Sequence, residues 1–263
     1  MEKQVLKITF LGTGTSQGVP VIACECLVCK SENSKDKRFR SSVLIEYNGK
    51  QLVIDTGPDF RSQMLENKVN RLDAVLFTHE HKDHISGLDD IRPFNFKQQA
   101  SIPIYCSLQV EEAIKREFHY VFADKKYPGI PEIELKRISL SPFELFDDLK
   151  VVPIEVKHYL MSVLGFRLNK FTYITDAKTI DLKEKEKIKG TEILVINALR
   201  IESHISHFNL DEALAFIDEI KPKEAYLTHI SHLFGKHEEI QKMLPEGVFA
   251  AYDGLQVQIN TNN

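Results

Sequence analysis

Four side chains of metal-binding type stand within six residues of this chain, and they are His79, His81, Asp83 and His84. They directly follow the apolar stretch 74–77, which predicts a short buried strand. His79 and His81 are two residues apart, so their side chains point the same way in an extended segment. Asp83 and His84 are adjacent and diverge, so they can serve a second ion beside the first. Because imidazole and carboxylate groups bind divalent metals, the sequence predicts a strand-end loop that contributes ligands to two ions.

This pattern, His79-x-His81-x-Asp83-His84, resembles the motif of the metallo-β-lactamase superfamily of hydrolases. That family places further ligands at strand ends downstream, in the order histidine, bridging aspartate, histidine. Three residues follow apolar runs in that order, and they are His158, Asp176 and His229. The resemblance assigns one metal to His79, His81 and His158. It assigns the other metal to Asp83, His84 and His229, with Asp176 between the two.

Asp55 also ends a predicted strand, in the run Ile54-Asp55-Thr56-Gly57. We interpret it as a residue that orients a ligand or a loop, and not as a metal ligand.

Three of the four cysteines lie together in the pattern Cys24-x-Cys26-x-x-Cys29. In a reducing compartment this spacing favours a metal site over a disulfide. A tetrahedral structural zinc needs a fourth ligand, and we predict His232, because its loop also carries the candidate ligand His229. A cluster of free or redox-active thiols is the alternative.

Composition limits the class of protein. The chain has 263 residues, of which 43% are hydrophobic and 27% charged, and a formal net charge of −4. We expect a single domain over residues 1–263, with a substantial core and no nucleic-acid partner. We find no apolar run that could span a bilayer and no apolar signal-peptide core, so we expect no membrane association and a cytoplasmic location.

The pattern of predicted elements mixes strands and helices in both halves of the chain. Asn48-Gly49 predicts a tight turn between two strands, 42–46 and 51–55. Asn209 and Glu212 predict a capping box at the start of a helix that ends near Lys221-Pro222. Periodicity alone supports a mixed α and β fold. The superfamily resemblance implies a four-layer αββα sandwich.

The resemblance also suggests residues that act on the substrate. His207 stands where related phosphodiesterases and the tRNA 3′-processing nuclease carry a histidine that acts on the scissile phosphate, and Asp83 is assigned a catalytic role with it. The alternative for His207 is a hydrogen bond to loop backbone, and the role of His204 is left open. Arg92 is a candidate phosphate ligand, with an ion pair to Asp89 or Asp90 as the alternative.

Three features narrow the resemblance, namely the opening Leu11-Gly12-Thr13-Gly14-Thr15-Ser16, the cysteine pattern, and Thr228-His229-Ile230-Ser231-His232 with Ala251-Tyr252-Asp253-Gly254. Together they resemble the PhnP-type phosphodiesterases. That family implies two active-site Mn²⁺ or Zn²⁺ ions, a separate structural Zn²⁺ and a homodimer. It also implies hydrolysis of a small cyclic phosphodiester of the phosphoribosyl type by a hydroxide that bridges the two ions. The alternatives are a tRNA 3′-processing-type nuclease, an acyl or thioester hydrolase, and a non-catalytic cofactor-biosynthesis accessory protein of the same fold.

Overall fold

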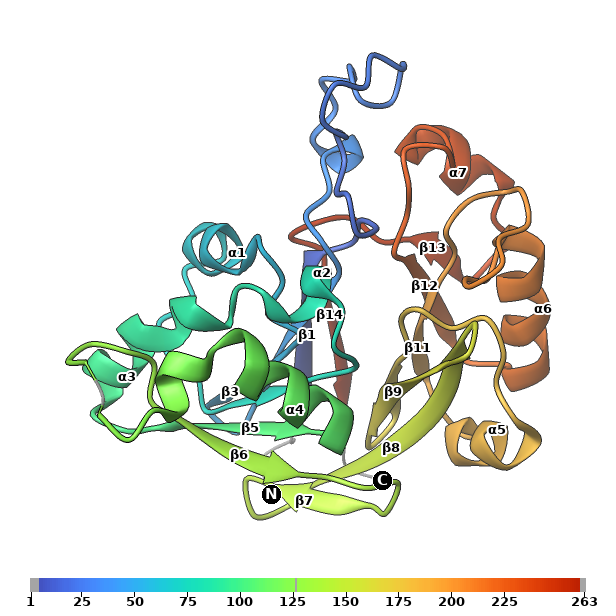
Figure 1. The fold of residues 1–263 in the computed structure, drawn as a ribbon. Helices are drawn as coiled ribbons and strands as arrows, with labels where there is room; N and C mark the ends of the chain where they lie inside the picture. The colour runs from blue at the N-terminus through green and yellow to red at the C-terminus, as the bar shows by residue number, and fades with distance from the viewer. Residues whose placement is uncertain (1–4, 126, 261–263) are drawn as a thin grey trace.

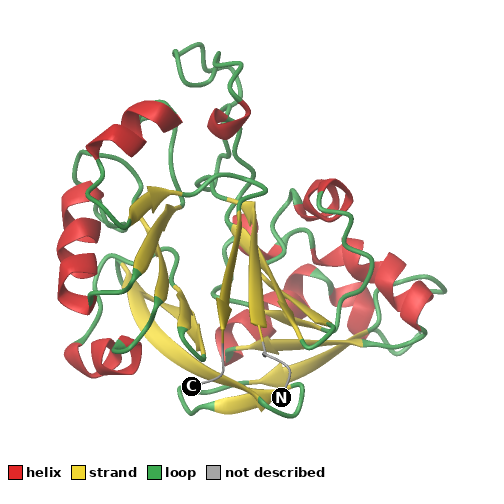
Figure 2. Cartoon of the chain, turned by 180° about the vertical axis from the view of Figure 1, so that it is seen from behind, coloured by secondary structure: helices red, strands yellow, loops and turns green. Residues whose placement is uncertain are grey.

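Two large sheets pack face to face in the computed structural model, which describes residues 5–125 and 127–260, and helices cover the outer face of each sheet (Figure 1). Figure 2 shows the same layers from behind, with the strands in the centre and the helices on both flanks. This arrangement confirms the αββα sandwich that the sequence resemblance predicted.

Each sheet has seven strands. The first sheet contains, in spatial order, β14 (Gln256–Asn260), β1 (Val5–Gly12), β2 (Ser42–Tyr47), β3 (Lys50–Ile54), β4 (Ala74–Leu76), β5 (Ile102–Cys106) and β6 (Ile133–Arg137). The second contains β13 (Val248–Ala250), β12 (Glu224–Thr228), β11 (Ile193–Asn197), β10 (Phe171–Tyr173), β9 (Met161–Leu168), β8 (Leu149–His158) and β7 (Phe143–Leu145).

Helices and buried side chains complete the layers. The helices are α1 (Phe60–Glu66), α2 (Lys82–Ile85), α3 (Arg92–Gln98), α4 (Leu108–Glu117), α5 (Leu182–Ile188), α6 (Leu210–Ile220) and α7 (His237–Met243), with short 3-10 helices η1 (Ser34–Asp36), η2 (Leu88–Ile91) and η3 (His119–Phe122). Successive strand residues face opposite sides, so Leu52 and Ile54 of β3 enter the core between the sheets, whereas Val53 packs under the helices. The helices of the second half cover a third core that includes Ile196 and Leu227.

The local predictions agree with most elements. The Asn48-Gly49 turn joins β2 to β3, and Asn209 and Glu212 form the capping box of α6. The helical spacing of residues 108–121 predicts one helix, but α4 ends at Glu117, because Phe118 leaves the helical conformation and a 3-10 turn follows. The pattern over 249–259 predicts strand character broken at Asp253-Gly254, and the structure has two strands there, β13 and β14, in different sheets.

Parallel strands gather the candidate site at one edge of the molecule. β3, β4 and β5 run parallel, and so do β10, β11 and β12. The carboxyl ends of parallel strands meet at one edge of a sheet. Asp55 and His79 therefore come from the first sheet, and Asp176 and His229 come from the second.

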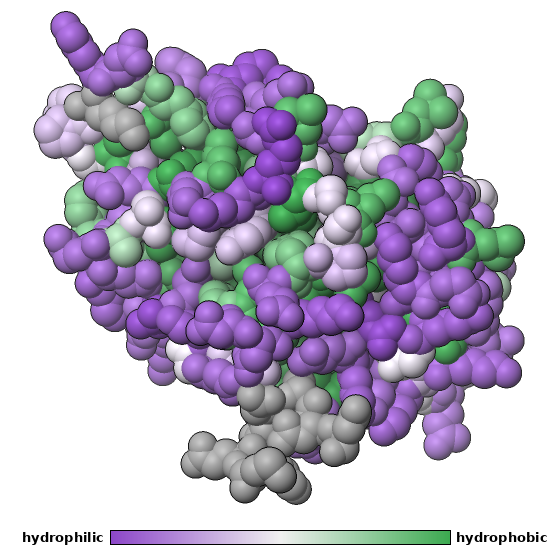
Figure 3. All heavy atoms as spheres, turned by 90° about the horizontal axis from the view of Figure 1, so that it is seen from below, coloured by the Kyte–Doolittle hydropathy of each residue, from purple (hydrophilic) through white to green (hydrophobic). Residues whose placement is uncertain are grey.

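The segment between β1 and β2 rises above this edge and is drawn in blue at the top of Figure 1. Seen from below, hydrophilic side chains predominate on the visible face, and hydrophobic groups show between them (Figure 3). Within the described ranges, no helix has both the length and the apolar character that crossing a bilayer requires.

Two glycines let the loop after β4 pack tightly against the loop after β3. Gly87 donates its backbone N–H to Thr56 O at 2.8 Å, and Thr56 donates to His84 O at 2.8 Å. A Cβ atom at Gly87 would lie 2.1 Å from Gly57 O, and one at Gly57 would lie 2.2 Å from Asp83 O. The backbones could not approach so closely with any larger residue at these positions.

We predict that Gly87→Ala lowers the free energy of unfolding by about 1–3 kcal/mol, because the methyl group must push two backbone segments apart. Urea denaturation should show a lower midpoint with an unchanged slope. The neighbouring replacement Ser86→Ala is the control and should change stability by less than about 0.5 kcal/mol. Equal stability of the two variants would contradict the close packing described here.

Candidate metal centre

Asp176 lies at the centre of a cluster that contains all seven predicted ligands. Its Oδ2 atom is 3.3 Å from His84 Nε2, and its Oδ1 atom is 3.4 Å from His229 Nε2. His84 Nε2 is also 3.2 Å from Asp83 Oδ2. Asp83, His84 and His229 thus meet at one side of the Asp176 carboxylate.

The other three predicted ligands stand close together beside this group. The ring centroids of His79 and His81 are 4.7 Å apart, and those of His81 and His158 are 5.3 Å apart. His79, His84 and Asp176 each offer a ligand atom within 4.8 Å of the others, and so do His158, Asp176 and His207. The structure therefore brings together the residues that the sequence predicted, and their role as ligands stays a prediction.

Hydrogen bonds at Nδ1 fix the orientation of four histidines. His84 donates from Nδ1 to Asp55 Oδ2 at 2.7 Å, and His158 donates to Ser206 O at 2.9 Å. The hydroxyl protons of Thr78 and Ser41 go to Asp55 Oδ2 and Gly14 O. These hydroxyl oxygens therefore accept from the Nδ1 atoms of His79, at 2.9 Å, and of His229, at 3.2 Å. In each case Nε2 is left to face the cluster, which is the arrangement that metal-binding histidines require.

Asp55 accepts the hydrogen bond from His84 Nδ1 and does not itself enter the cluster of candidate ligands. Its Oδ1 atom accepts from the Thr78 backbone N–H at 2.9 Å, and its Oδ2 atom accepts from Thr78 Oγ1 and His84 Nδ1. This is the orienting role that the sequence predicted for it.

Three residues of the site adopt left-handed backbone conformations close to the carboxyl ends of strands. The φ angles are 65° at Asp55, 58° at Asp176 and 57° at His229. Such angles are uncommon for residues other than glycine, asparagine and aspartate, and they cluster at functional sites. From these positions Asp176 and His229 enter the cluster, whereas the Asp55 carboxylate reaches Thr78 and His84 behind it.

Charges within the cluster determine how its groups titrate. Burial disfavours the charged form of His84, but Asp83, Asp55 and Asp176 outweigh it and raise the pKa of His84 well above its usual value. Burial alone would raise the pKa of Asp176, yet the surrounding histidines hold it well below its usual range. The positive charge of protonated His84 therefore compensates the negative charge of these carboxylates. A bound cation would compensate the same charge, so cation binding must release the proton from His84.

The free nitrogen atoms fit a metal centre. His79 Nε2 and His84 Nε2 are buried and have no hydrogen-bond partner in the described part of the chain. A buried polar atom without a partner costs about 1–3 kcal/mol, so His79 Nε2 calls for a ligand. His84 Nε2 lies within ion-pair distance of Asp83 and Asp176, where a cation could replace its proton. Imidazole and carboxylate donors in this number suit two zinc or manganese ions.

His207 stands against the same cluster. Its ring centroid is 4.5 Å from that of His158 and 4.8 Å from that of His229, and its Nδ1 atom is 3.7 Å from Asp176 Oδ1. Burial, with His229 nearby, lowers the pKa of His207 to about 3. Its Nδ1 atom is buried and has no hydrogen-bond partner among the described residues. The alternative prediction, a hydrogen bond from His207 to loop backbone, is therefore not formed at this atom. His204 lies next to it, with ring centroids 5.2 Å apart.

Arg92 forms an ion pair with Asp89, which is one of the alternatives predicted for it from the sequence. Its Nη2 atom is 2.6 Å from Asp89 Oδ2, and Nε donates to Asp89 O at 3.1 Å. Tyr120 also donates to the Asp89 carboxylate. The pairing supports a structural role, and phosphate binding by Arg92 stays a prediction.

A second group of candidate ligands joins three cysteines of the projecting segment to His232 in the loop after β12. Cys24, Cys26, Cys29 and His232 offer ligand atoms within 4.8 Å of one another, and all four cysteines of the chain are free thiols. His232 Nδ1 is 3.3 Å from Cys24 Sγ and 3.4 Å from Cys26 Sγ. Hydrogen bonds from the Cys29 backbone and from His232 lower the pKa of Cys26 to about 6. Three sulfurs and one imidazole in this arrangement can hold one tetrahedral zinc ion.

The contacts that hold His229 were not predicted from the sequence, although Thr15 lies in the opening motif. Ser41 bonds to its Nδ1 atom, and Thr15 Oγ1 lies 3.3 Å from its Nε2 atom. Both residues are remote in sequence, and a serine or threonine in a loop carries no distinctive pattern.

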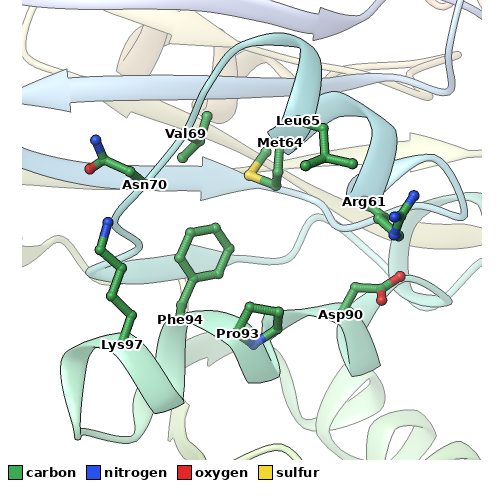
Figure 4. Close-up of a pocket in the computed structure, with 9 residues that line it drawn as sticks. All are labelled: Arg61, Met64, Leu65, Val69, Asn70, Asp90, Pro93, Phe94 and Lys97. Carbon is green, nitrogen blue, oxygen red and sulfur yellow. The ribbon is translucent and has the colours of Figure 1, made fainter.

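A separate pocket of about 420 Å³ lies between α1 and α3. Met64 and Phe94 line it, and Arg61 and Lys97 stand at opposite ends in the close-up (Figure 4). None of its lining residues belongs to either ligand cluster.

Comparisons with known proteins show the family to which the chain belongs. Residues 50–230 match the family model described as the beta-lactamase superfamily domain. A crystal structure of a diphosphatase from the PhnP family is 38% identical, with a TM-score of 0.91, and the match covers 97% of each chain. The chain belongs to the metallo-β-lactamase superfamily and, within it, to the PhnP family.

Two further relatives are informative. Zinc-bound PqqB from Methylobacterium extorquens has a TM-score of 0.81 at 19% identity, over 95% of this chain and 99% of that one, which shows a shared fold. An octanoyltransferase of Porphyromonas gingivalis is 39% identical over 258 residues, which are 97% of this chain. This chain spans only 52% of that relative.

We predict that Cys26→Ser lowers both the zinc content and the melting temperature, because binding energy at such a site is coupled to folding. Elemental analysis and thermal unfolding of the purified protein measure the two effects. Cys106→Ala is the matched control, since Cys106 is buried in the first sheet and away from the other three cysteines. It should leave the zinc content unchanged. Full zinc content in Cys26→Ser, or a disulfide between two of the three cysteines, would contradict the site.

Proposed function

We propose that this protein is a metal-dependent phosphodiesterase that hydrolyses a small cyclic phosphodiester of the phosphoribosyl type. The observation that carries the proposal is the convergence of histidine Nε2 atoms, held through their Nδ1 atoms, on the buried carboxylate of Asp176. The diphosphatase of the PhnP family, which matches along the whole chain, supports a phosphoryl substrate.

We propose two divalent ions, manganese or zinc, in this cluster and one structural zinc at Cys24, Cys26, Cys29 and His232. Two bound cations would stabilise charge on phosphoryl oxygens and make hydroxide available near neutral pH. His79, His81 and His158 would hold one ion. Asp83, His84 and His229 would hold the other, and Asp176 would contact both. Five neutral imidazoles and two carboxylates leave such a centre positive, so it attracts an anionic substrate.

The protein's own groups set the geometry for this reaction. The Asp55 carboxylate keeps the proton of His84 on Nδ1, and the Ser206 carbonyl does the same for His158. His207 lies near Asp176 Oδ1, whereas His84 lies near Oδ2, and the Nδ1 atom of His207 has no partner among the described residues. Because burial lowers its pKa, the ring is neutral near pH 7, and it can donate a hydrogen bond that stabilises charge on the oxygen that leaves phosphorus.

Acyl-ester or thioester hydrolysis is the second candidate, and the octanoyltransferase relative is the observation that favours it. About half of that relative lies outside the match, so its transferase activity can belong to the unmatched half. Substrates of both kinds are therefore included in the following test.

Hydrolysis of chromogenic esters by protein loaded with Mn²⁺ or Zn²⁺ tests the reaction class. We expect metal-dependent hydrolysis of bis(p-nitrophenyl) phosphate, with much slower release from p-nitrophenyl phosphate and p-nitrophenyl octanoate. The metal-free protein is the control. No activity with either metal, or a preference for the monoester or the octanoate, would refute the phosphodiesterase.

The variant Asp176→Ala tests the shared carboxylate. It removes a negative charge between two cations, so we expect at least one ion per chain to be lost and activity to fall with it. Asp181→Ala, at an exposed aspartate before α5, should keep the full metal content. Two active-site ions and normal activity in Asp176→Ala would show that this carboxylate holds neither ion.

The variant His207→Ala tests the group that acts on the leaving oxygen. We expect turnover to fall by about 10²–10⁴-fold, as is usual for a positioned acid–base group, with the metal content unchanged. The loss should be smaller for diesters with good leaving groups, which need little stabilisation of the leaving oxygen. His119→Ala, at an exposed histidine of η3, is the control. Equal losses for good and poor leaving groups would instead indicate a role in substrate binding.

A further inference from the structure

Within the described ranges, the Asp176 carboxylate has one hydrogen-bond donor that is not a candidate metal-site histidine. Thr175 Oγ1 donates to Asp176 Oδ2 at 2.6 Å, and both side chains are buried. The imidazole nitrogens of His84, His229 and His207 lie farther from the same carboxylate, at 3.3, 3.4 and 3.7 Å. The Thr175 hydroxyl therefore makes the shortest of these contacts to the carboxylate.

The contact from Thr175 would persist when cations bind, whereas the one from His84 would change. An imidazole nitrogen that binds a cation offers its lone pair to that cation and carries no proton. His84 Nε2 would then no longer donate to Asp176. The Thr175 hydroxyl is not a candidate ligand, so it can keep its hydrogen bond to Oδ2. It would therefore continue to fix the orientation of the carboxylate in the metal-loaded protein.

A second buried hydroxyl lies close to Thr175. Tyr173 ends β10, and the next residue still pairs with β11 through a backbone hydrogen bond of 2.9 Å. Because the chain is extended there, the side chains of Tyr173 and Thr175, two residues apart, point to the same side. Burial, Asp55 and Asp176 raise the pKa of Tyr173 well above its usual value, and Thr175 acts against them. The Tyr173 hydroxyl thus lies near both Thr175 and the carboxylates of the site.

The two hydroxyls can form a chain of hydrogen bonds that ends at Asp176. The Tyr173 hydroxyl is fully buried and has no hydrogen-bond partner in the described part of the chain. A tyrosine hydroxyl keeps its proton near neutral pH, so it is a donor that needs an acceptor. Thr175 gives its own proton to Asp176, and its oxygen can still accept another. A hydrogen bond from Tyr173 to Thr175 would therefore satisfy the buried Tyr173 hydroxyl.

We propose that Thr175 is a positioning residue that holds the Asp176 carboxylate between the two ions, and that Tyr173 supports it by donating to Thr175 Oγ1. This inference rests on the two-ion centre of the proposed function. A carboxylate in a fixed orientation can present one oxygen to each ion, whereas one that rotates can present both oxygens to the same ion. The two hydroxyls therefore favour binding of a pair of ions over binding of a single ion.

Calorimetric titration with Mn²⁺ of the purified protein, freed of active-site metal, tests the proposal, because it measures ion affinity apart from hydrolysis. Thr175→Val keeps the branched shape of the side chain and removes the hydroxyl. We expect the weaker of the two ions to bind about 10–100-fold less tightly, which is the usual loss when a group that orients a metal ligand is removed. Thr175→Ser keeps a hydroxyl and should restore the wild-type affinity.

Thr172→Val is the matched control. Thr172 is also fully buried, on β10, and its hydroxyl forms a hydrogen bond of the same length, 2.6 Å, with Thr191 Oγ1 before the start of β11. This variant should lower the melting temperature of the metal-free protein about as much as Thr175→Val does, but leave both Mn²⁺ affinities unchanged. Unchanged affinities in Thr175→Val, or equal losses in Thr172→Val, would overturn the proposal.

Tyr173→Phe tests the second hydroxyl. If Tyr173 acts through Thr175, this variant should bind the weaker ion less tightly than the wild type. The double variant Tyr173→Phe with Thr175→Val should then bind Mn²⁺ no more weakly than Thr175→Val alone, because residues of one hydrogen-bond network do not contribute independently. Losses that simply add would show that Tyr173 acts elsewhere and would overturn its part in the proposal.

The number of bound ions separates this inference from the proposed reaction. A wild-type protein that binds fewer than two Mn²⁺ ions per chain would refute the two-ion centre and this inference with it. A protein that binds two ions but hydrolyses no diester would refute the proposed reaction only. The Mn²⁺ affinities of Thr175→Val and Thr172→Val would still decide the role of Thr175.

Discussion

The buried hydrogen bonds of Asp55 hold the site together. Asp55 ends β3, and its two oxygens accept from the backbone and side chain of Thr78, which follows β4, and from His84 in α2. A single carboxylate thus fixes the start and the end of the loop that carries four candidate ligands. Burial raises the pKa of Asp55, and only the bonds from His84 and Thr78 offset that penalty. Loss of the Asp55 carboxylate would remove the acceptor of three buried donors, the Thr78 backbone N–H, the Thr78 hydroxyl and His84 Nδ1.

The two candidate metal sites are coupled through one loop. His229 faces Asp176, and His232, three residues later, faces the cysteines. Gly14 bridges to Ile230 in this loop, and Ser41 bonds to both Gly14 and His229. A filled cysteine site would therefore restrain the loop that positions His229. Through this coupling the projecting segment would help to position His229, although its cysteines do not enter the histidine cluster.

Many of the candidate metal ligands could be predicted because they lie close together in the sequence. His79, His81, Asp83 and His84 stand within one short run, and strand-end residues in parallel strands must meet at one edge. The capping box at Asn209 and the turn at Asn48 depend on neighbouring residues only. The supports of the ligands could not be predicted, because Ser41 and the Ser206 carbonyl reach their histidines through the fold.

The central claim is that Asp176 lies between two metal ions while a third ion is held by the cysteines. Anomalous diffraction from crystals of the Mn²⁺-loaded protein, recorded at the manganese and zinc absorption edges, tests it most directly. The account predicts two manganese peaks on either side of the Asp176 carboxylate. It also predicts one zinc peak among Cys24, Cys26, Cys29 and His232, because thiolates prefer the softer ion. A single peak in the histidine cluster, or an Asp176 carboxylate that contacts neither ion, would contradict it.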